Sequence, residues 1–378
     1  MPAVKAPLFA VLGALALLAV APVTEAGARK VPRGFYGVMW DGGAVEAAEA
    51  EQATQWDLMA RSGVESVRTA FSWQHAQPVG GQPPSFERTD RIVALASTRN
   101  IKILPVVFET PLWAARGGRP GEAPARAADY VAYLEALALR YGPQGSFWAE
   151  NPELPRKPLR EWQIWNEPHL DGYWRSEGDD IWAQGYAALL QASNAALERL
   201  DPGSVTVLAG LADYAWRHLR RLYRAGIRGH FDVAAMNLFT TRPGLVLKGV
   251  RLFRADMREA GDRRKPIWLT ETTWPASKGR VNKPRPAWQR VWETSDSGVA
   301  RRLSAFYKLA VRARRRLGLG RVYWYTWSSA FRTSDLFDYS GLVRWRQGGY
   351  DSRPALRAYA RSARRHQGCR KSATGTCR

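Results

Sequence analysis

Two glutamates, Glu167 and Glu271, have the residue type and the sequence context that chemistry on a glycosidic bond requires. Glu167 follows a short run of β-favouring residues at 161–165, with Asn166 between them, and Glu271 directly follows a similar run at 266–270. Cleavage with retention needs one carboxyl group that protonates the leaving oxygen and a second that attacks the anomeric carbon. The alternative is a turn at Asn166-Glu167-Pro168 after a buried strand and a surface charge at Glu271. The positions of the two residues in the fold decide between these interpretations.

From residue 29 onward the chain alternates strand-like and helix-like segments, which predicts a parallel sheet covered by helices. The expected strands span 35–39, 66–70, 102–108, 161–165, 204–209, 233–238, 266–270 and 322–327. The expected helices span 45–61, 89–99, 125–140, 181–200, 215–225, 245–260, 298–317 and 354–363. Eight such pairs favour an α/β fold with a single (β/α)8 TIM barrel over an open doubly wound sheet. The two glutamates then follow strands four and seven, on the face where barrels place functional residues.

The two ends of the chain differ in composition from the predicted barrel, which covers 29–366. Residues 1–28 carry one lysine, an apolar run at 8–20 and then small residues, a pattern typical of a secretory signal peptide. The run is short for a membrane span, and an uncleaved membrane anchor is the alternative. Residues 367–378 form a basic tail that contains the only cysteines, Cys369 and Cys377. In an exported protein these could form a small disulfide loop, with metal binding or free thiols as alternatives.

The two glutamate motifs resemble those of the retaining glycoside hydrolases of the (β/α)8-barrel clan A. In that clan the acid/base Glu follows an Asn after strand four, and the nucleophilic Glu ends strand seven. The segment Thr110-Pro111-Leu112-Trp113-Ala114 is similar to the corresponding turn of family 39 enzymes and related exopolysaccharide hydrolases. Within the clan, families 39 and 5, with their cellulase-like and β-xylosidase-like members, are the nearest match. The resemblance implies that Glu167 is the acid/base and Glu271 the nucleophile.

The resemblance also implies substrate-binding residues at the ends of other strands. Arg68 on the second strand would hold the nucleophile ionised, with a surface arginine as the alternative. Asn166 would donate a hydrogen bond to the sugar 2-hydroxyl. Trp327 on the eighth strand would form the floor beneath the sugar. Further expected contacts are Trp40 after the first strand, Glu109 and Trp113 after the third, and Asn237 on the sixth.

The sixth strand departs from the clan pattern, in which a His and, two residues later, a Tyr or another His lie near the glutamates. Asn237 and Phe239 occupy the matching positions in this chain. Asn237 can still hydrogen-bond a sugar or a carboxylate, whereas Phe239 cannot. The phenol or imidazole that orients the nucleophile is then either missing or supplied from another loop, for example by Tyr214 or His230. The departure allows a substrate unlike that of the better-known enzymes.

Composition indicates a carbohydrate partner and no cofactor. The chain has 17 Trp, whose flat apolar rings suit the C–H face of a sugar. Its net charge of +22 favours anionic surfaces or uronic-acid polysaccharides, and nucleic-acid binding is the rival interpretation, without a recognised module to support it. The five His lack the spacing of metal ligands, so no metal is expected. We expect a monomer that does not associate with membranes once its leader is removed.

These observations together predict a secreted, extracellular enzyme, with attachment to the cell surface as a variant. Its expected activity is the hydrolysis of O-glycosidic bonds in a β-linked polysaccharide or oligosaccharide by double displacement, and thus polysaccharide degradation. The alternative is a non-catalytic glycan-binding barrel in which the changes on the sixth strand reflect lost turnover.

Overall fold

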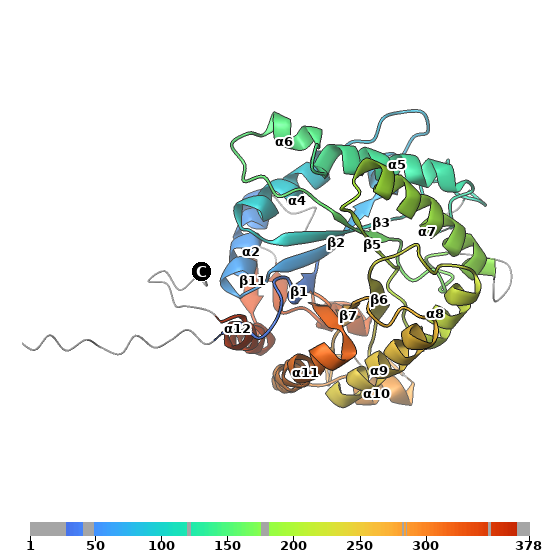
Figure 1. The fold of residues 1–378 in the computed structure, drawn as a ribbon. Coiled ribbons are helices and arrows are strands. Elements are labelled where there is room, and N and C mark those ends of the chain that lie inside the picture. Colours follow the sequence, from blue (N-terminus) through green and yellow to red (C-terminus); the bar gives the residue numbers. More distant parts are fainter. Residues whose placement is uncertain are drawn as a thin grey trace, which may run out of the picture.

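The computed structural model describes residues 28–40, 49–118, 122–174, 181–281, 283–284, 286–346 and 349–368. The expected leader, apart from Ala28, and both cysteines lie outside these residues. Eight parallel strands form one sheet in the order β5-β4-β3-β2-β1-β8-β7-β6 (Figure 1). Parallel bridges from Val207 to Val233 and from Leu211 to Met236 join its two edges. The chain is therefore a single (β/α)8 TIM barrel, as the alternation of segments predicted.

The strands and helices follow the predicted order with small shifts at their ends. The strands are β1 (Tyr36–Met39), β2 (Ser66–Ser72), β3 (Lys102–Phe108), β4 (Glu161–Ile164), β5 (Val205–Val207), β6 (Ala234–Asn237), β7 (Ile267–Thr272) and β8 (Leu319–Trp324). The helices that cover them are α2 (Glu49–Arg61), α4 (Glu87–Thr98), α5 (Ala127–Tyr141), α7 (Ile181–Leu200), α8 (Ala215–Arg224), α9 (Pro243–Glu259), α11 (Asp296–Leu317) and α12 (Pro354–Gln367). Short helices in the loops are α3 (Trp73–Ala76), α6 (Ser146–Glu150) and α10 (Ala287–Trp292).

Local sequence signals set several helix ends. The Ser295 hydroxyl accepts a hydrogen bond from the backbone of Gly298 and begins α11. Gly318, at φ 64°, ends the same helix in the left-handed conformation that favours glycine. Proline lies in the first turn of α9 and of α12, where its missing N–H costs no hydrogen bond. Among the described residues, every helix is too short or too polar to traverse a bilayer.

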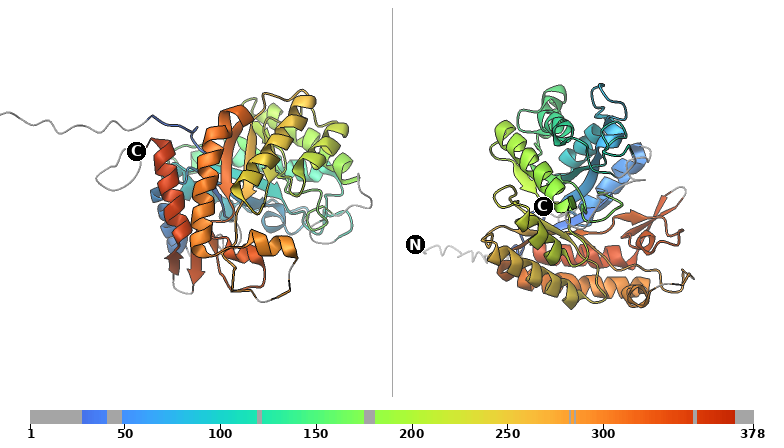
Figure 2. Two further views of the ribbon diagram at one scale, coloured as in Figure 1. Left: turned by 90° about the horizontal axis from the view of Figure 1, so that it is seen from below. Right: turned by 90° about the vertical axis from the view of Figure 1, so that its right-hand side faces the viewer.

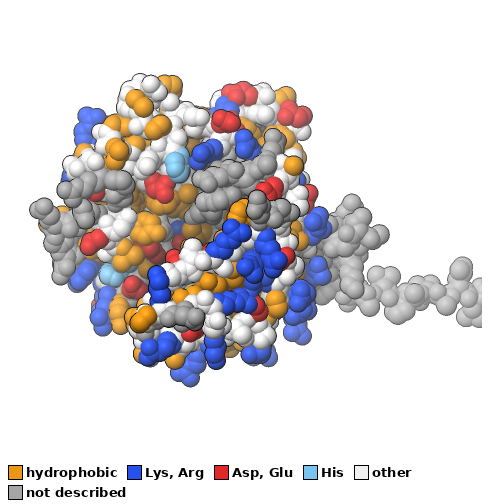
Figure 3. Space-filling view, turned by 180° about the vertical axis from the view of Figure 1, so that it is seen from behind, with side chains coloured by type: hydrophobic (Ala, Val, Ile, Leu, Met, Phe, Trp, Pro, Cys, Tyr) orange, Lys and Arg blue, Asp and Glu red, His pale blue; other side chains and the backbone are white. Residues whose placement is uncertain are grey.

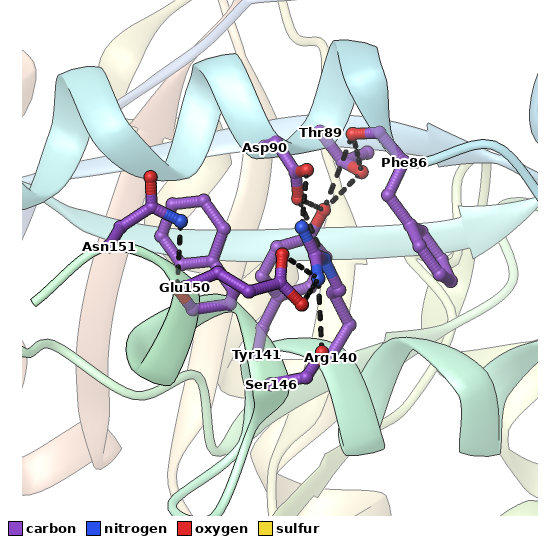
Figure 4. Close-up of polar contacts among 9 residues, drawn as sticks. Phe86, Thr89, Asp90, Arg140, Tyr141, Ser146, Glu150 and Asn151 are labelled. Carbon is purple, nitrogen blue, oxygen red and sulfur yellow. Dashed lines mark hydrogen bonds and ion pairs between the residues drawn. The ribbon is translucent and has the colours of Figure 1, made fainter.

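A polar cluster joins α4, α5 and α6 on the outside of the barrel (Figure 4). The guanidinium of Arg140 contacts the carboxylate of Asp90 at 2.7 Å and that of Glu150 at 2.6 Å. The phenol of Tyr141 donates to the same Asp90 carboxylate at 2.6 Å. Because each charge has an opposite charge or a donor beside it, this cluster stabilises the packing of the three helices and leaves no group free for chemistry.

The end of strand β8 differs from the sequence prediction. The strand stops at Trp324, three residues before the expected end, and the chain then enters a second, three-stranded sheet. This small sheet consists of β9 (Ser328–Ser329), β10 (Val343–Arg346) and β11 (Gly349–Ser352), with the 3-10 helix η1 (Leu336–Tyr339) between β9 and β10. It lies at the end of the barrel opposite to the first described residues (Figure 2). The small sheet adds one wall to the functional face.

Candidate active site

A cavity of about 620 Å³ opens at the carboxyl ends of the barrel strands, and both predicted glutamates line it. Figure 3 views this end of the molecule, where apolar and acidic side chains lie around the centre while Lys and Arg gather to one side. Glu167 and Glu271 are 8% and 5% exposed, so both carboxyl groups are largely withdrawn from water. Burial makes electrostatic interactions at this site stronger than on the surface.

Arg68 is the cation at the floor of this cavity and is only 1% exposed. Its Nη1 donates to Oε1 of Glu271 at 2.7 Å, and its Nη2 donates to Oδ1 of Asn166 at 2.8 Å. Its Nε donates to Oε1 of Gln163 on strand β4 at 2.7 Å. The expected ion pair with Glu271 is thus present, and Arg68 is not a surface charge. Gln163, which the sequence did not single out, fixes the plane of the guanidinium.

Asn237, at the end of β6, connects the other glutamate to this group. Its Nδ2 donates to Oε1 of Glu167 at 2.7 Å and lies 3.3 Å from Oδ1 of Asn166. Its own oxygen accepts a hydrogen bond of 2.8 Å from the hydroxyl of Thr270 on β7. A hydrogen-bonded chain therefore runs from Glu271 through Arg68, Asn166 and Asn237 to Glu167.

The orientation of the Asn166 amide follows from these contacts. Both Arg68 and Asn237 direct N–H groups at its Oδ1, so the oxygen must face them. Asn166 lines the cavity. Its Nδ2 is then the group that remains to donate a hydrogen bond to a substrate hydroxyl. This orientation is compatible with the role that the resemblance implies for Asn166.

The environment of Glu167 raises its pKa above the usual value for a glutamate. Burial is the largest cause, because it disfavours the charged form. The hydrogen bond from Asn237 and the charge of Arg68 lower the pKa, and the nearby carboxylate of Asp213 raises it. A carboxyl group that keeps its proton at higher pH is suited to act as a general acid.

The backbone is unusual where these residues leave their strands. Trp165 and Glu167 have φ angles of 69° and 44°, and Glu109 has 66°. Residues other than glycine rarely adopt this left-handed region, and such conformations are concentrated at functional sites. Gly210 is also required, because a β-carbon there would lie 2.5 Å from Oδ1 of Asn237. Neither feature is visible as a sequence motif.

The structure places the remaining predicted residues differently. Glu109 lines the cavity and is half-buried, but no hydrogen bond or ion pair joins it to Arg68, the alternative partner considered from the sequence. Trp40 is buried against Trp56 and donates from Nε1 to Ser328 at 3.2 Å, and it does not line the cavity. Trp113 is 40% exposed, but it packs edge-on against another tryptophan outside the cavity.

The expected role of Trp327 as the floor beneath a sugar is wrong. Its side chain is fully buried and donates from Nε1 to Oε1 of Gln55 on α2 at 2.9 Å. The reason is the early end of β8, which turns Trp327 into the interior and brings Tyr325 and Thr326 to the cavity wall. Trp324 is buried in the core, as expected.

An aromatic wall takes the place expected for tryptophan. Phe239, Tyr325 and Phe337 line the cavity and contact one another edge to face, with ring centroids between 5.0 and 6.1 Å apart. The proposed substitutes for the missing strand-six residue do not join them. Tyr214 is 59% exposed and stacks over a neighbouring arginine, and neither it nor His230 lines the cavity. The phenols that do line the cavity are those of Tyr173 and Tyr325.

No known family model and no curated protein matches the chain. Its fold is similar to that of many solved structures. A family 39 glycoside hydrolase from the gut symbiont Bacteroides cellulosilyticus WH2 has a TM-score of 0.64 at 16% identity, and the match covers 89% of this chain and 64% of that one. A monomeric β-xylosidase from Caulobacter crescentus CB15 has a TM-score of 0.60 at 17% identity, with 88% and 68% covered.

A GH5_18 structure from Streptomyces cattleya, solved in complex with Manβ1-4GlcNAc, has a TM-score of 0.63 at 18% identity, with 88% and 81% covered. Glycoside hydrolases of families 39 and 5 are therefore among the structural neighbours, as the resemblance of the two glutamate motifs suggested. This chain spans less than two thirds of the length of the Bacteroides structure. At these identities the comparisons show that the barrel fold is shared.

Proposed function

We propose that this protein is a retaining glycoside hydrolase in which Glu271 is the nucleophile and Glu167 the acid/base. The observation that carries the proposal is the hydrogen-bonded chain that joins the two glutamates across one cavity. It gives the two carboxyl groups different surroundings, which is what unlike roles require. Glu271 contacts a buried arginine, whereas Glu167 contacts a neutral amide and has a raised pKa.

The proposed reaction has two steps. The Glu271 carboxylate attacks the anomeric carbon, while Glu167 transfers its proton to the leaving oxygen and the first product departs. Glu167, now ionised, then takes a proton from water, which attacks the same carbon and releases the sugar from Glu271. Asn166 would bind the 2-hydroxyl through Nδ2, and the aromatic wall would pack against the sugar ring.

The proposed substrate is a β-linked oligosaccharide or polysaccharide whose sugar at the point of cleavage is uncharged or bears an amine. Three further carboxylates, Glu109, Asp335 and Asp338, line the cavity beside the two glutamates, whereas Arg68 is the only cation among its described lining residues. Backbone N–H groups hold Asp338 as an acceptor at 2.7 to 3.0 Å. A uronic acid would meet repulsion here, so the net charge of the chain does not define the substrate.

The test is a panel of aryl β-glycosides and polysaccharides, which includes neutral, amino and uronic acid sugars, with variants of each glutamate. Glu271→Ala should abolish turnover of every substrate. Glu167→Ala should retain cleavage of substrates with good leaving groups, and azide should restore its second step. Equal loss in both variants, without rescue by azide, would show that the roles are wrong. Binding of glycans without any turnover would favour the non-catalytic barrel.

Export is the second part of the proposal. The lysine, the apolar run at 8–20 and the small residues that follow support a secretory leader. The protein would then act outside the cytoplasm as a monomer. Mass determination of the protein purified from the culture medium would locate the cleavage site, and recovery of the uncleaved chain from the membrane fraction would favour an anchor.

A further inference from the structure

The cavities at the two ends of the barrel differ sharply in charge. At the end opposite the candidate active site, called the basal end here, the amino ends of β3, β4 and β5 frame a second cavity of about 600 Å³. Basic side chains surround this cavity: Arg33, Lys102, Arg156, Lys157 and Arg160. The one carboxylate among its described lining residues is Glu161. The basal cavity is thus cationic, whereas the active-site cavity is rich in carboxylates.

Glu161 does not offset this charge. Its two oxygens each accept a hydrogen bond of 2.5 Å from the buried guanidinium of Arg321. Lys102 contacts the same carboxylate at 3.5 Å. Of the other cations, Arg160 pairs with Asp201 at 3.3 Å, while Arg156 and Lys157 are exposed and have no ion pair among the described residues. Arg156 donates to the backbone carbonyl of Pro143, which leaves its charge without a counter-ion. The positive charges of Arg156 and Lys157 therefore remain for a ligand.

Further cations lie at the basal end outside this cavity. Barrel helices run antiparallel to their strands, so their last turns all lie at this end (Figure 1). Most of these last turns carry arginines: Arg61, Arg199, Arg224, Arg258, Arg314, Arg315, Arg316, Arg364 and Arg365. One cation per helix is favourable at the negative end of the helix dipole. The dipole does not account for three arginines in α11, or for Arg156 and Lys157 in a loop.

The described chain begins at the same basal end. The guanidinium of Arg314 donates to the carbonyl of Lys30 at 2.7 Å, and the Lys30 backbone donates to the carbonyl of His366 at 2.8 Å. Both contacts hold the first described residues against the ends of α11 and α12, away from the small sheet (Figure 2). The apolar run at 8–20 ends eight residues before Ala28, a length of chain that reaches at most about 28 Å. As long as this run is attached to the barrel, a membrane that engages it therefore lies close to the basal end.

We infer that the basal end binds the surface of an anionic lipid membrane, with the active-site cavity facing away from it. This differs from the expectation, drawn from the sequence, that the protein does not associate with membranes once its leader is removed. Charge complementarity and the place where the chain enters the barrel both favour this partner. The floor of the basal cavity is aliphatic, with Val93, Ile101 and Leu159, and no aromatic side chain is among its described lining residues. It therefore lacks the flat rings that favour sugars, which argues against a soluble anionic glycan. The inference does not rest on the proposed glycosidase activity.

The test uses the full chain with vesicles of phosphatidylcholine alone and of an equal mixture with phosphatidylglycerol. Binding should be much tighter to the mixed vesicles and should fall as salt is added. Arg156→Gln/Lys157→Gln should weaken binding to mixed vesicles about 25-fold, at about fivefold per cation. The matched control is Lys248→Gln/Arg251→Gln, which removes the same charge from the exposed side of α9 and should change binding less than twofold.

Every variant contains the same apolar run, so its contribution to vesicle binding cancels in the comparison. Equal weakening by both double variants would mean that net charge alone, and not the basal end, attracts the membrane. Binding that does not depend on phosphatidylglycerol would overturn the inference. Tight binding of soluble polygalacturonate at the basal end, without binding to the mixed vesicles, would also overturn the inference.

Discussion

The Nδ2 atom of Asn237 donates a hydrogen bond of 2.7 Å to Oε1 of Glu167. The residue that departs from the clan pattern on strand six thus contacts the proposed acid directly. Its amide favours the ionised form of Glu167 and lowers the pKa that burial raises. Asn237 is for this reason a positioning and tuning residue, and the departure from the clan pattern does not by itself indicate lost activity.

Two substitutions should therefore move the pKa of Glu167 in opposite directions. Asn237→Ala removes a hydrogen bond that lowers this pKa, so the basic limb of the pH–activity profile should move to higher pH. Asp213→Asn removes a negative charge that raises the pKa, so the same limb should move to lower pH. The measurement is kcat/KM against pH for both variants. Shifts of the same sign would contradict Glu167 as the acid.

Arg68 should control the opposite, acidic limb. Arg68→Met leaves the buried Glu271 carboxylate without its charge partner, so a higher pH is needed to keep it ionised and the acidic limb should move upward. We also expect kcat/KM to fall on the order of a hundredfold or more. Arg254→Met is the control, because Arg254 is another buried arginine but donates to the carbonyls of Leu317 and Arg263, away from the cavity. The control should lose stability and keep its pH profile.

The aromatic wall can be tested against the tryptophan expected from the sequence. Tyr325→Ala removes a ring that lines the cavity, so KM should rise about tenfold. Trp327→Phe keeps a buried ring but loses the hydrogen bond to Gln55, which should cost about 1 kcal/mol of stability and leave KM unchanged. Steady-state kinetics and thermal unfolding of the two variants separate these effects. A raised KM for Trp327→Phe alone would restore the sequence-based assignment.

His169 should make the fold sensitive to acid. Its ring stacks on that of His218 with centroids 4.1 Å apart, and burial, followed by the charges of His218 and Arg221, lowers its pKa to about 3. Because the unfolded chain takes up this proton below its ordinary pKa of about 6.5 while the folded chain does not, stability is lost as pH falls from about 6.5 towards 3.

Replacement of this histidine should remove part of that loss. For His169→Phe, the decrease in unfolding free energy between pH 7 and 5 should be smaller than in the unmodified protein, by at most about 2 kcal/mol. Denaturant unfolding at both pH values provides the measurement. The exposed His75, replaced in the same way, should leave the decrease unchanged. An unchanged decrease in His169→Phe would mean that its imidazole is already charged in the folded protein.

The parts of the fold that follow from periodic sequence patterns were predictable. Helix α7 and strand β3 have the limits expected from their apolar patterns, and Glu167 and Glu271 lie where their strands end. The end of β8 was not predictable in this way, since the aromatic run that begins at Tyr323 continues to Trp327 after the strand has stopped. What ends the strand is the small sheet, which pairs residues more than a dozen positions apart.

The contacts within the site could not be predicted from the sequence for a similar reason. Asn237 reaches Glu167 only because Gly210 leaves space beside it and Thr270 holds its oxygen. These residues come from three different segments of the chain, and no sequence pattern indicates that they contact one another. The ion pair of Arg68 with Glu271 could be expected from the resemblance, whereas the role of Gln163 in orienting Arg68 could not.

The most direct measurement is to trap the proposed intermediate. A 2-deoxy-2-fluoro-β-glycoside with a dinitrophenolate leaving group, built on the sugar that the substrate panel identifies, should form the glycosyl-enzyme faster than water can release it. Mass spectrometry of the digested protein should then locate one added sugar on the peptide that contains Glu271, and Glu271→Ala should remain unlabelled. A sugar attached to Glu109 or Glu167, or turnover that gives a product of inverted configuration without any adduct, would contradict Glu271 as the nucleophile.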